Sequence, residues 1–142
     1  PATSSAASDV YKRQDLNISK PIFIKISPDE NNKSVRNILK LINDSSVAGI
    51  IATNTTIDKS NLLQDNFKSI EGGVSGAPLM KRSTEKLSYI SSLSKSIPII
   101  GVGGVISKQD FNAKINAGAG LVQIYTGFVI KGPKIIQEIL SI

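Results

Sequence analysis

The sequence contains no cysteine and no histidine in its 142 residues. It therefore holds no disulfide framework, no thiolate or imidazole metal site, and no Ser–His or Cys–His catalytic pair. Proton chemistry must use lysine, serine, threonine, tyrosine or a carboxylate. We predict no metal site.

Aromatic residues and long apolar stretches are also scarce. Aromatic residues make up 5% of the chain, which leaves no platform for stacking nucleobases. No apolar stretch reaches the ~18–20 residues that cross a bilayer, and the amino end lacks the apolar core of a signal peptide. The expectation from these absences is one soluble domain in the cytoplasm.

Charges of both signs are scattered along the chain. Lysine and arginine number 17 against 11 aspartates and glutamates, a net charge of +6, but no basic block is longer than Lys12-Arg13 or Lys81-Arg82. An anionic ligand would suit the net charge, yet scattered lysines usually form a solvated surface. We therefore predict no nucleic-acid partner.

The first 19 residues are small, polar and aperiodic, unlike the rest of the chain. Residues 5–14 (SAASDVYKRQ) resemble translated vector or adaptor sequence more than a fold element. Order is predicted to begin near Lys20, where an apolar segment starts. We therefore divide the chain into a disordered, non-native-looking leader, residues 1–19, and a domain, residues 20–142.

Apolar segments alternate with helical patterns along the domain. Short apolar runs predict strands over residues 21–26, 49–53, 97–101 and 121–125. Amphipathic or capped segments predict helices over residues 32–44, 84–95, 107–116 and 132–140. The order βαβαβαβα indicates an α/β fold with a parallel sheet and right-handed crossovers.

One connection, residues 57–81, is longer than the ~15 residues usual in a compact domain. It carries the glycine-rich segment 72–78 (GGVSGAP). Glycines at this density favour a functional loop. The alternative is a flexible surface insertion without a binding role.

Polar side chains accompany the first two predicted strands. Lys25 lies within an apolar strand, where its charge is costly to bury unless it meets an anion or an electron-rich ring. Asn54 offers donors and an acceptor to the edge of an amide-bearing or carboxylate-bearing ring, and Thr53, Thr55 and Thr56 add hydroxyls. The plainer alternatives are a lysine that reaches water from a strand end and a polar turn that caps the backbone.

Glycines follow the last two predicted strands. Gly103 and Gly104 would let the backbone approach an anion, and barrels commonly hold phosphate in the loops after their last two strands. We expect further free N–H groups near Pro133, at the predicted start of the last helix. The segment 101–106 is not a dinucleotide fingerprint, because Ile106 stands where the third glycine is required.

Five segments stand in the order and spacing of a known family. They are residues 25–29 (KISPD), 51–56 (IATNTT), 72–79 (GGVSGAPL), 101–104 (GVGG) and 123–128 (QIYTGF). From about residue 21 to the carboxyl terminus, the chain resembles class 2 dihydroorotate dehydrogenase. The resemblance implies a (β/α)8 TIM barrel, present here as a four-unit (β/α)4 carboxyl-terminal fragment.

The resemblance also implies an activity and a set of ligands. The family oxidises dihydroorotate to orotate in pyrimidine synthesis, with FMN as cofactor and a membrane quinone as electron acceptor, at the cytoplasmic face of the membrane. Asn54 and Thr55 would bind the substrate. Carried over motif by motif, the FMN contacts would be Lys25 against the flavin ring, Thr53 and Gly76, with Gly104, Tyr125 and Thr126 at the phosphate.

Parts of the family's machinery have no counterpart in the sequence. Class 2 enzymes use a serine base upstream of the strand that carries Lys25, and Ser4, Ser5 and Ser8 match no family motif. We therefore assign no catalytic residue. The amino-terminal helices that contact quinone and membrane are likewise unmatched. We expect the chain to be inactive alone, and to be weakly stable or self-associating through an uncovered barrel face.

Three other interpretations stay open. A different phosphate-binding barrel enzyme would not bind FMN, and Asn54 would then be incidental. A non-catalytic flavin-binding half barrel would pair with a partner chain. A class 1 relative is the third, although residues 54–56 (NTT) and 76–79 (GAPL) favour class 2.

Overall fold

The computed structural model describes residues 20–141, so the predicted leader, residues 1–19, lies outside the described part. Four parallel strands form one sheet in chain order. They are β1 (Phe23–Ile26), β2 (Gly49–Ala52), β3 (Ile99–Val102) and β4 (Leu121–Gln123). The peptide bond between Ala52 and Thr53 is cis. The predicted α/β fold is confirmed, and every strand boundary falls within two residues of its predicted position.

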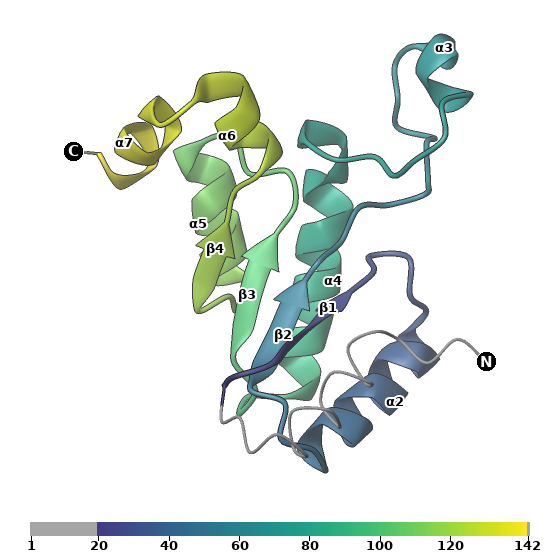
Figure 1. Ribbon diagram of the computed structural model, residues 1–142, viewed down its shortest axis with the longest axis vertical. Helices are drawn as coiled ribbons and strands as arrows, with labels where there is room; N and C mark the ends of the chain where they lie inside the picture. Colours follow the sequence, from purple (N-terminus) through teal and green to yellow (C-terminus); the bar gives the residue numbers. More distant parts are fainter. Residues whose placement is uncertain (1–19, 142) are drawn as a thin grey trace.

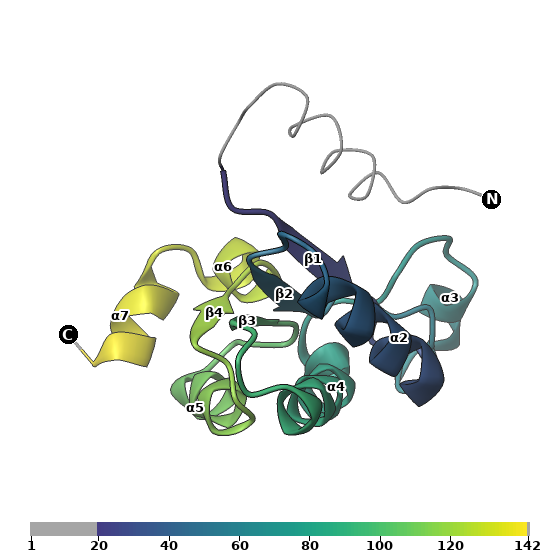
Figure 2. The ribbon, with the colours of Figure 1, turned by 90° about the horizontal axis from the view of Figure 1, so that it is seen from below.

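Helices connect the strands, and three of them pack on one face of the sheet (Figure 2). The helices are α2 (Asn32–Asn43), α3 (Asp65–Lys68), η1 (Ala77–Leu79), α4 (Met80–Leu93), α5 (Lys108–Asn116), α6 (Thr126–Lys131) and α7 (Lys134–Leu140). Figure 2 shows α2, α4 and α5 together on one side of the strands, and Figure 1 shows α6 beyond the carboxyl end of β4. None of the helices within residues 20–141 is long and apolar enough to cross a bilayer.

The main hydrophobic core lies between the sheet and the helices α2 and α4. Alternate strand residues point toward the helices, as the period of two in a strand requires. The large buried members of this core are Ile26, Ile50 and Ile99 from the strands and Val35, Leu39, Ile42, Leu87 and Ile90 from the helices. Each large apolar side chain removed from water contributes roughly 1.5–3 kcal/mol, so this face supplies most of the stability.

Side chains on the opposite face of the sheet form an open row. Lys25, Ile51, Ile100 and Leu121 are register partners across the four strands. Lys25 and Leu121 are exposed, and the two isoleucines are half-buried. Parallel sheets are normally covered on both faces. This open row therefore marks apolar surface that the described residues do not cover, as expected for part of a barrel.

Caps and turns explain the main helix boundaries. Asn31 accepts a hydrogen bond from the Ser34 N–H at 2.9 Å and begins α2. Ser107 accepts from the Asp110 N–H and begins α5, as predicted. The helix predicted over residues 84–95 begins earlier, at Met80, because η1 leads directly into it. The helix predicted over residues 132–140 begins at 134, and α6, which precedes it, was not predicted.

Candidate functional site

A pocket opens where the carboxyl ends of the strands meet. Parallel strands bring the residues at these ends to the same edge of a sheet, which is where barrels place their ligands. All eight residues proposed as ligand contacts line the pocket, namely Lys25, Thr53, Asn54, Thr55, Gly76, Gly104, Tyr125 and Thr126. The structure thus brings together residues spread over about a hundred positions of sequence. Their individual roles toward a ligand stay predictions.

The side of the pocket formed by β1 and β2 presents one cation and several hydrogen-bonding groups. Lys25 and the side chains of Asn54 and Thr55 are exposed. The Asn54 N–H donates to the Ile26 carbonyl oxygen at 2.8 Å, which fixes the backbone and leaves the side-chain amide for a ligand. Thr53 is buried, and its hydroxyl donates to the Asn54 carbonyl oxygen at 2.9 Å.

Thr56 lies outside the pocket, which corrects the expectation that its hydroxyl would face a ligand. Its Oγ1 donates instead to Asp29 Oδ1 at 2.6 Å. Arg82 Nε lies 2.9 Å from the same oxygen, an ion pair that is not aligned as a hydrogen bond. Arg82 Nη1 also donates to Asp58 Oδ2 at 2.8 Å. Hydrogen bonding by Ser60, with help from the Arg82 charge, lowers the pKa of Asp58. This network ties the loops after β1 and β2 to α4.

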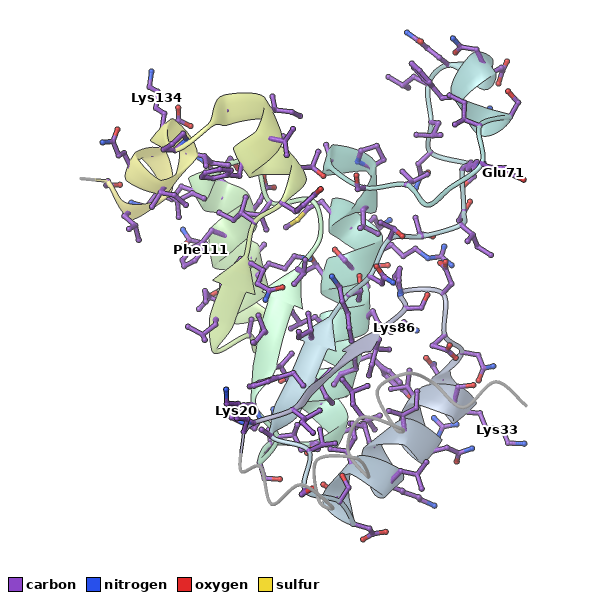
Figure 3. All side chains as sticks on the ribbon, in the orientation of Figure 1. Lys20, Lys33, Glu71, Lys86, Phe111 and Lys134 are labelled. Carbon is purple, nitrogen blue, oxygen red and sulfur yellow. The ribbon has the colours of Figure 1, made fainter. Side chains whose placement is uncertain are left out.

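The long connection after β2 has two structurally distinct parts. Thr56 and Val74 form an antiparallel bridge that closes the connection at its base. Beyond the bridge, the segment that contains α3 projects from the molecule (Figure 1), and Figure 3 labels Glu71 near its end. The residues of this segment are mostly exposed. Ser75 and Gly76, which follow the bridge, line the pocket. The connection therefore combines an exposed excursion with a segment at the site.

The loop after β3 lies tightly against the first turn of α4. Gly104 has a φ of 81°, and a Cβ added there would lie 2.5 Å from Met80 Cα, so this position requires glycine. Within residues 20–141, the N–H groups of Gly104 and Val105 donate to no other protein group. Both residues line the pocket, as does Thr126, whose Oγ1 donates to Ser75 Oγ at 3.0 Å. Unpaired N–H groups beside a hydroxyl suit an anion.

Pro133 and its neighbours do not line the pocket, contrary to the expectation that N–H groups near Pro133 would help to hold an anion. The unpredicted helix α6 intervenes, and its first residues, Thr126 and Gly127, occupy the pocket wall instead. The segment 126–131 (TGFVIK) combines glycine with threonine and valine, which have low helix propensity. Local propensity therefore could not identify α6.

Seven further residues line the pocket, and of these only Gly103 was expected to approach a ligand. They are Ser75, Leu79, Val102, Gly103, Val105, Gln123 and Gly127. Most belong to the five matched segments, so their place in those segments was the available signal. The cavity volume is about 90 Å³, below the roughly 300–1,000 Å³ typical of small-molecule sites. The pocket formed by the described residues is therefore too small to enclose a whole ligand of that kind.

The fold and the site together define the class of protein. Four parallel strands in chain order, with helices on one face and a pocket at the carboxyl ends of the strands, are the features of a partial (β/α) barrel. The sequence model of the dihydroorotate dehydrogenase family matches residues 2–141, and the chain belongs to that family. The matched range takes in most of residues 1–19 as well as the domain. The resemblance identified from the five segments is confirmed.

Curated relatives and solved structures agree with this assignment. Over 129 residues, the chain is 45% identical to dihydroorotate dehydrogenase (quinone) of Christiangramia forsetii, covering 90% of this chain and 38% of the relative. Over 130 residues, it is 48% identical to the enzyme of that name from Trichodesmium erythraeum, covering 86% and 34%.

Among solved structures, the dihydroorotate dehydrogenase of Eimeria tenella in complex with ferulenol superposes with a TM-score of 0.80 at 32% identity. The superposition covers 85% of this chain and 32% of that one. The chain thus spans between about a third and two fifths of the length of the relatives it matches. The barrel fold of these neighbours confirms the predicted fold class.

Proposed function

We propose that this chain is the part of a quinone-dependent dihydroorotate dehydrogenase that supplies one wall of the FMN and orotate sites. The observation that carries the proposal is the convergence of eight motif residues from all four strand ends on one pocket. FMN, when bound, would accept hydride from dihydroorotate and deliver its electrons to a quinone. The names of the curated relatives support the same reaction.

The phosphate end of the cofactor would lie against the loops after β3 and β4. The unpaired N–H groups of Gly104 and Val105 provide donors without a competing protein acceptor in the described residues. Thr126 and Tyr125 also line the pocket and would complete the phosphate contacts. An anion at this position would satisfy donors that are otherwise unpaired, which is the fit that a phosphate requires.

The ring and the substrate would lie toward β1 and β2. Lys25 would place its ammonium against the flavin ring, and Thr53 and Gly76 would contact the cofactor at its sides. Asn54 and Thr55 have exposed side chains beside them and would bind the carboxylate and amide groups of orotate. The Asn54–Ile26 backbone bond holds this segment against the end of β1 before a ligand arrives.

The described residues offer binding groups but no obvious general base. Lys25 and Tyr125 are the ionisable side chains of the pocket within residues 20–141, and neither corresponds to the serine base of the family. We therefore propose that the chain binds its ligands without turning them over. The proton acceptor, the quinone contact and the membrane contact would come from parts of the family's fold outside the described residues.

The visible spectrum of the chain mixed with FMN tests this proposal. We expect a shifted flavin band that moves again when orotate is added, and no bleaching by dihydroorotate in the absence of oxygen. Asn54→Ala should abolish the response to orotate while FMN still binds. Asn37→Ala, at an exposed position on α2, is the matched control and should leave both responses intact.

Each contrary result removes a distinct part of the proposal. Bleaching by dihydroorotate would show that a base is present after all. A chain that binds inorganic phosphate but not FMN would favour another phosphate-binding barrel enzyme. An orotate response that survives Asn54→Ala would remove the substrate role of Asn54.

A further inference from the structure

Lys114 is a buried lysine that no ligand assignment uses. It lies on α5 with 0% of its surface exposed, and it is the largest fully buried side chain of the described residues. Burial lowers its pKa to about 8, and the nearby Asp110 carboxylate partly opposes this shift. The side chain therefore remains mostly protonated at neutral pH. Burying an ammonium costs free energy that an apolar side chain of similar size would not, so the charge calls for an explanation.

Two hydroxyl groups of α4 receive the hydrogen bonds of Lys114. Its Nζ lies 2.5 Å from Ser83 Oγ and 2.9 Å from Thr84 Oγ1. An ammonium can only donate, so both hydroxyls must accept from it and turn their own hydrogens elsewhere. Thr84 donates to the Met80 carbonyl oxygen at 2.7 Å. Ser83 lies 3.0 Å from the Gly103 carbonyl oxygen.

The hydroxyl hydrogen of Ser83 has two carbonyl acceptors within reach, Gly103 and Met80, and Gly103 is the nearer. Ser83 Oγ is 3.0 Å from the Gly103 carbonyl oxygen and 3.1 Å from the Met80 carbonyl oxygen, and the Met80 oxygen also accepts from Thr84 Oγ1 at 2.7 Å. A hydroxyl has one hydrogen to donate. We assign this hydrogen to the Gly103 carbonyl oxygen, the nearer acceptor. The resulting bond continues a line of hydrogen bonds from Lys114 through Ser83 to the loop after β3.

Gly103 is held where it meets this line. Its φ is 110°, and an added Cβ would lie 2.9 Å from Ser83 Oγ, so backbone and hydroxyl are in direct contact. The next two residues, Gly104 and Val105, carry the unpaired N–H groups at the pocket. We propose that Lys114 is a positioning residue, which orients the Ser83 hydroxyl onto Gly103 and thereby presents these N–H groups to the FMN phosphate. The phosphate part of this inference rests on the function proposed above.

A pair of substitutions on α4 separates this role from simple packing. Ser83→Ala and Thr84→Val each remove one acceptor of Lys114, but only Ser83 contacts the loop. Affinities for FMN and for riboflavin, which lacks the phosphate, are measured by quenching of flavin fluorescence. We expect Ser83→Ala to weaken FMN binding about tenfold, the worth of one hydrogen bond, and to leave riboflavin binding unchanged. Thr84→Val should change neither, and Lys114→Met should follow Ser83→Ala.

Hydrogen exchange provides a second measurement that needs no ligand. The Ile106 N–H, at the end of the same loop, donates to Asp110 Oδ2 at 3.1 Å. Its exchange in the free chain should be roughly tenfold faster in Ser83→Ala than in the unaltered chain or in Thr84→Val, because a loosened loop opens this bond more often.

The outcomes distinguish the inference from the function on which it rests. Equal effects of Ser83→Ala and Thr84→Val on exchange and binding, or equal losses for FMN and riboflavin, would overturn the positioning role. If the unaltered chain bound FMN no better than riboflavin, the phosphate assignment would fail. The exchange of Ile106 would still decide whether Ser83 anchors the loop.

Discussion

The two faces of the sheet are built from the same four strands but serve different ends. On the helix-covered face, Ile26, Ile50 and Ile99 are buried in the core with α2 and α4. On the other face, the open row leaves Leu121 67% exposed and Lys25 exposed beside the pocket. The helix-covered face therefore supplies most of the buried apolar contacts, and the opposite face is left open beside the pocket. Alternation along each strand therefore lets one face hold the fold together while the other remains available.

The largest expected difference is between two leucines on opposite faces. Leu87 is 0% exposed in the helix-side core, whereas Leu121 belongs to the open row. Leu87→Ala should lower the free energy of unfolding by about 2–5 kcal/mol, because it leaves a cavity. Leu121→Ala should lower it by less than about 0.5 kcal/mol. Urea denaturation of both variants measures the difference, and equal losses would mean that the open row is buried in solution.

A smaller effect should come from pH through Lys114, on the helix-covered side. Burial lowers its pKa from 10.5 to about 8, so the unfolded chain binds more protons between these values. Stability should therefore rise with pH from about 8 to about 10.5, by at most about 3 kcal/mol, and this contribution should be flat below 8. Urea unfolding at several pH values should show the rise in the unaltered chain. The Lys114→Met variant should lack this rise. If the free energy of unfolding depended on pH in the same way in both chains, the buried charge would be refuted.

The smallest effect on stability should accompany a change in association. Leu121→Lys places a charge at an exposed position of the open row, so the free energy of unfolding should change by less than about 0.5 kcal/mol. The charge should also discourage contact between the open rows of two chains. Sedimentation velocity at increasing concentration measures this contact. An unaltered chain that is already monomeric throughout would contradict self-association through this face.

The features that the sequence predicted well are those set by local chemistry. Val35, Leu39 and Ile42 lie at helical spacing and are buried on one side of α2, and Ser107 caps α5 through its own hydroxyl. The strands follow from short apolar runs between polar turns. Placing the strand ends together then required only the rule that parallel strands share one carboxyl edge. This rule accounts for the seven proposed contacts that follow or end the strands, whereas Gly76 reaches the pocket through the long connection that the Thr56–Val74 bridge closes.

The features that the sequence did not reveal depend on tertiary contacts. Thr56 stands in the same polar run as Asn54, and only the position of Asp29 decides that its hydroxyl turns away from the pocket. In the sequence, Lys114 cannot be distinguished from a surface lysine. Only the structure shows that Ser83 and Thr84 of α4 lie beside its ammonium. The start of α6 likewise depends on its neighbours, since its residues favour helix only weakly.

The order of the strands also bears on how the chain reaches its fold. Each strand pairs with the strand just before or just after it in sequence, so no pairing within the described sheet waits for a strand made much later. Ribosomes add roughly 5–20 residues per second, while a helix or a short loop closes in microseconds or less. The sheet can therefore grow one βα unit at a time during translation, so that the order of synthesis is also the order of assembly.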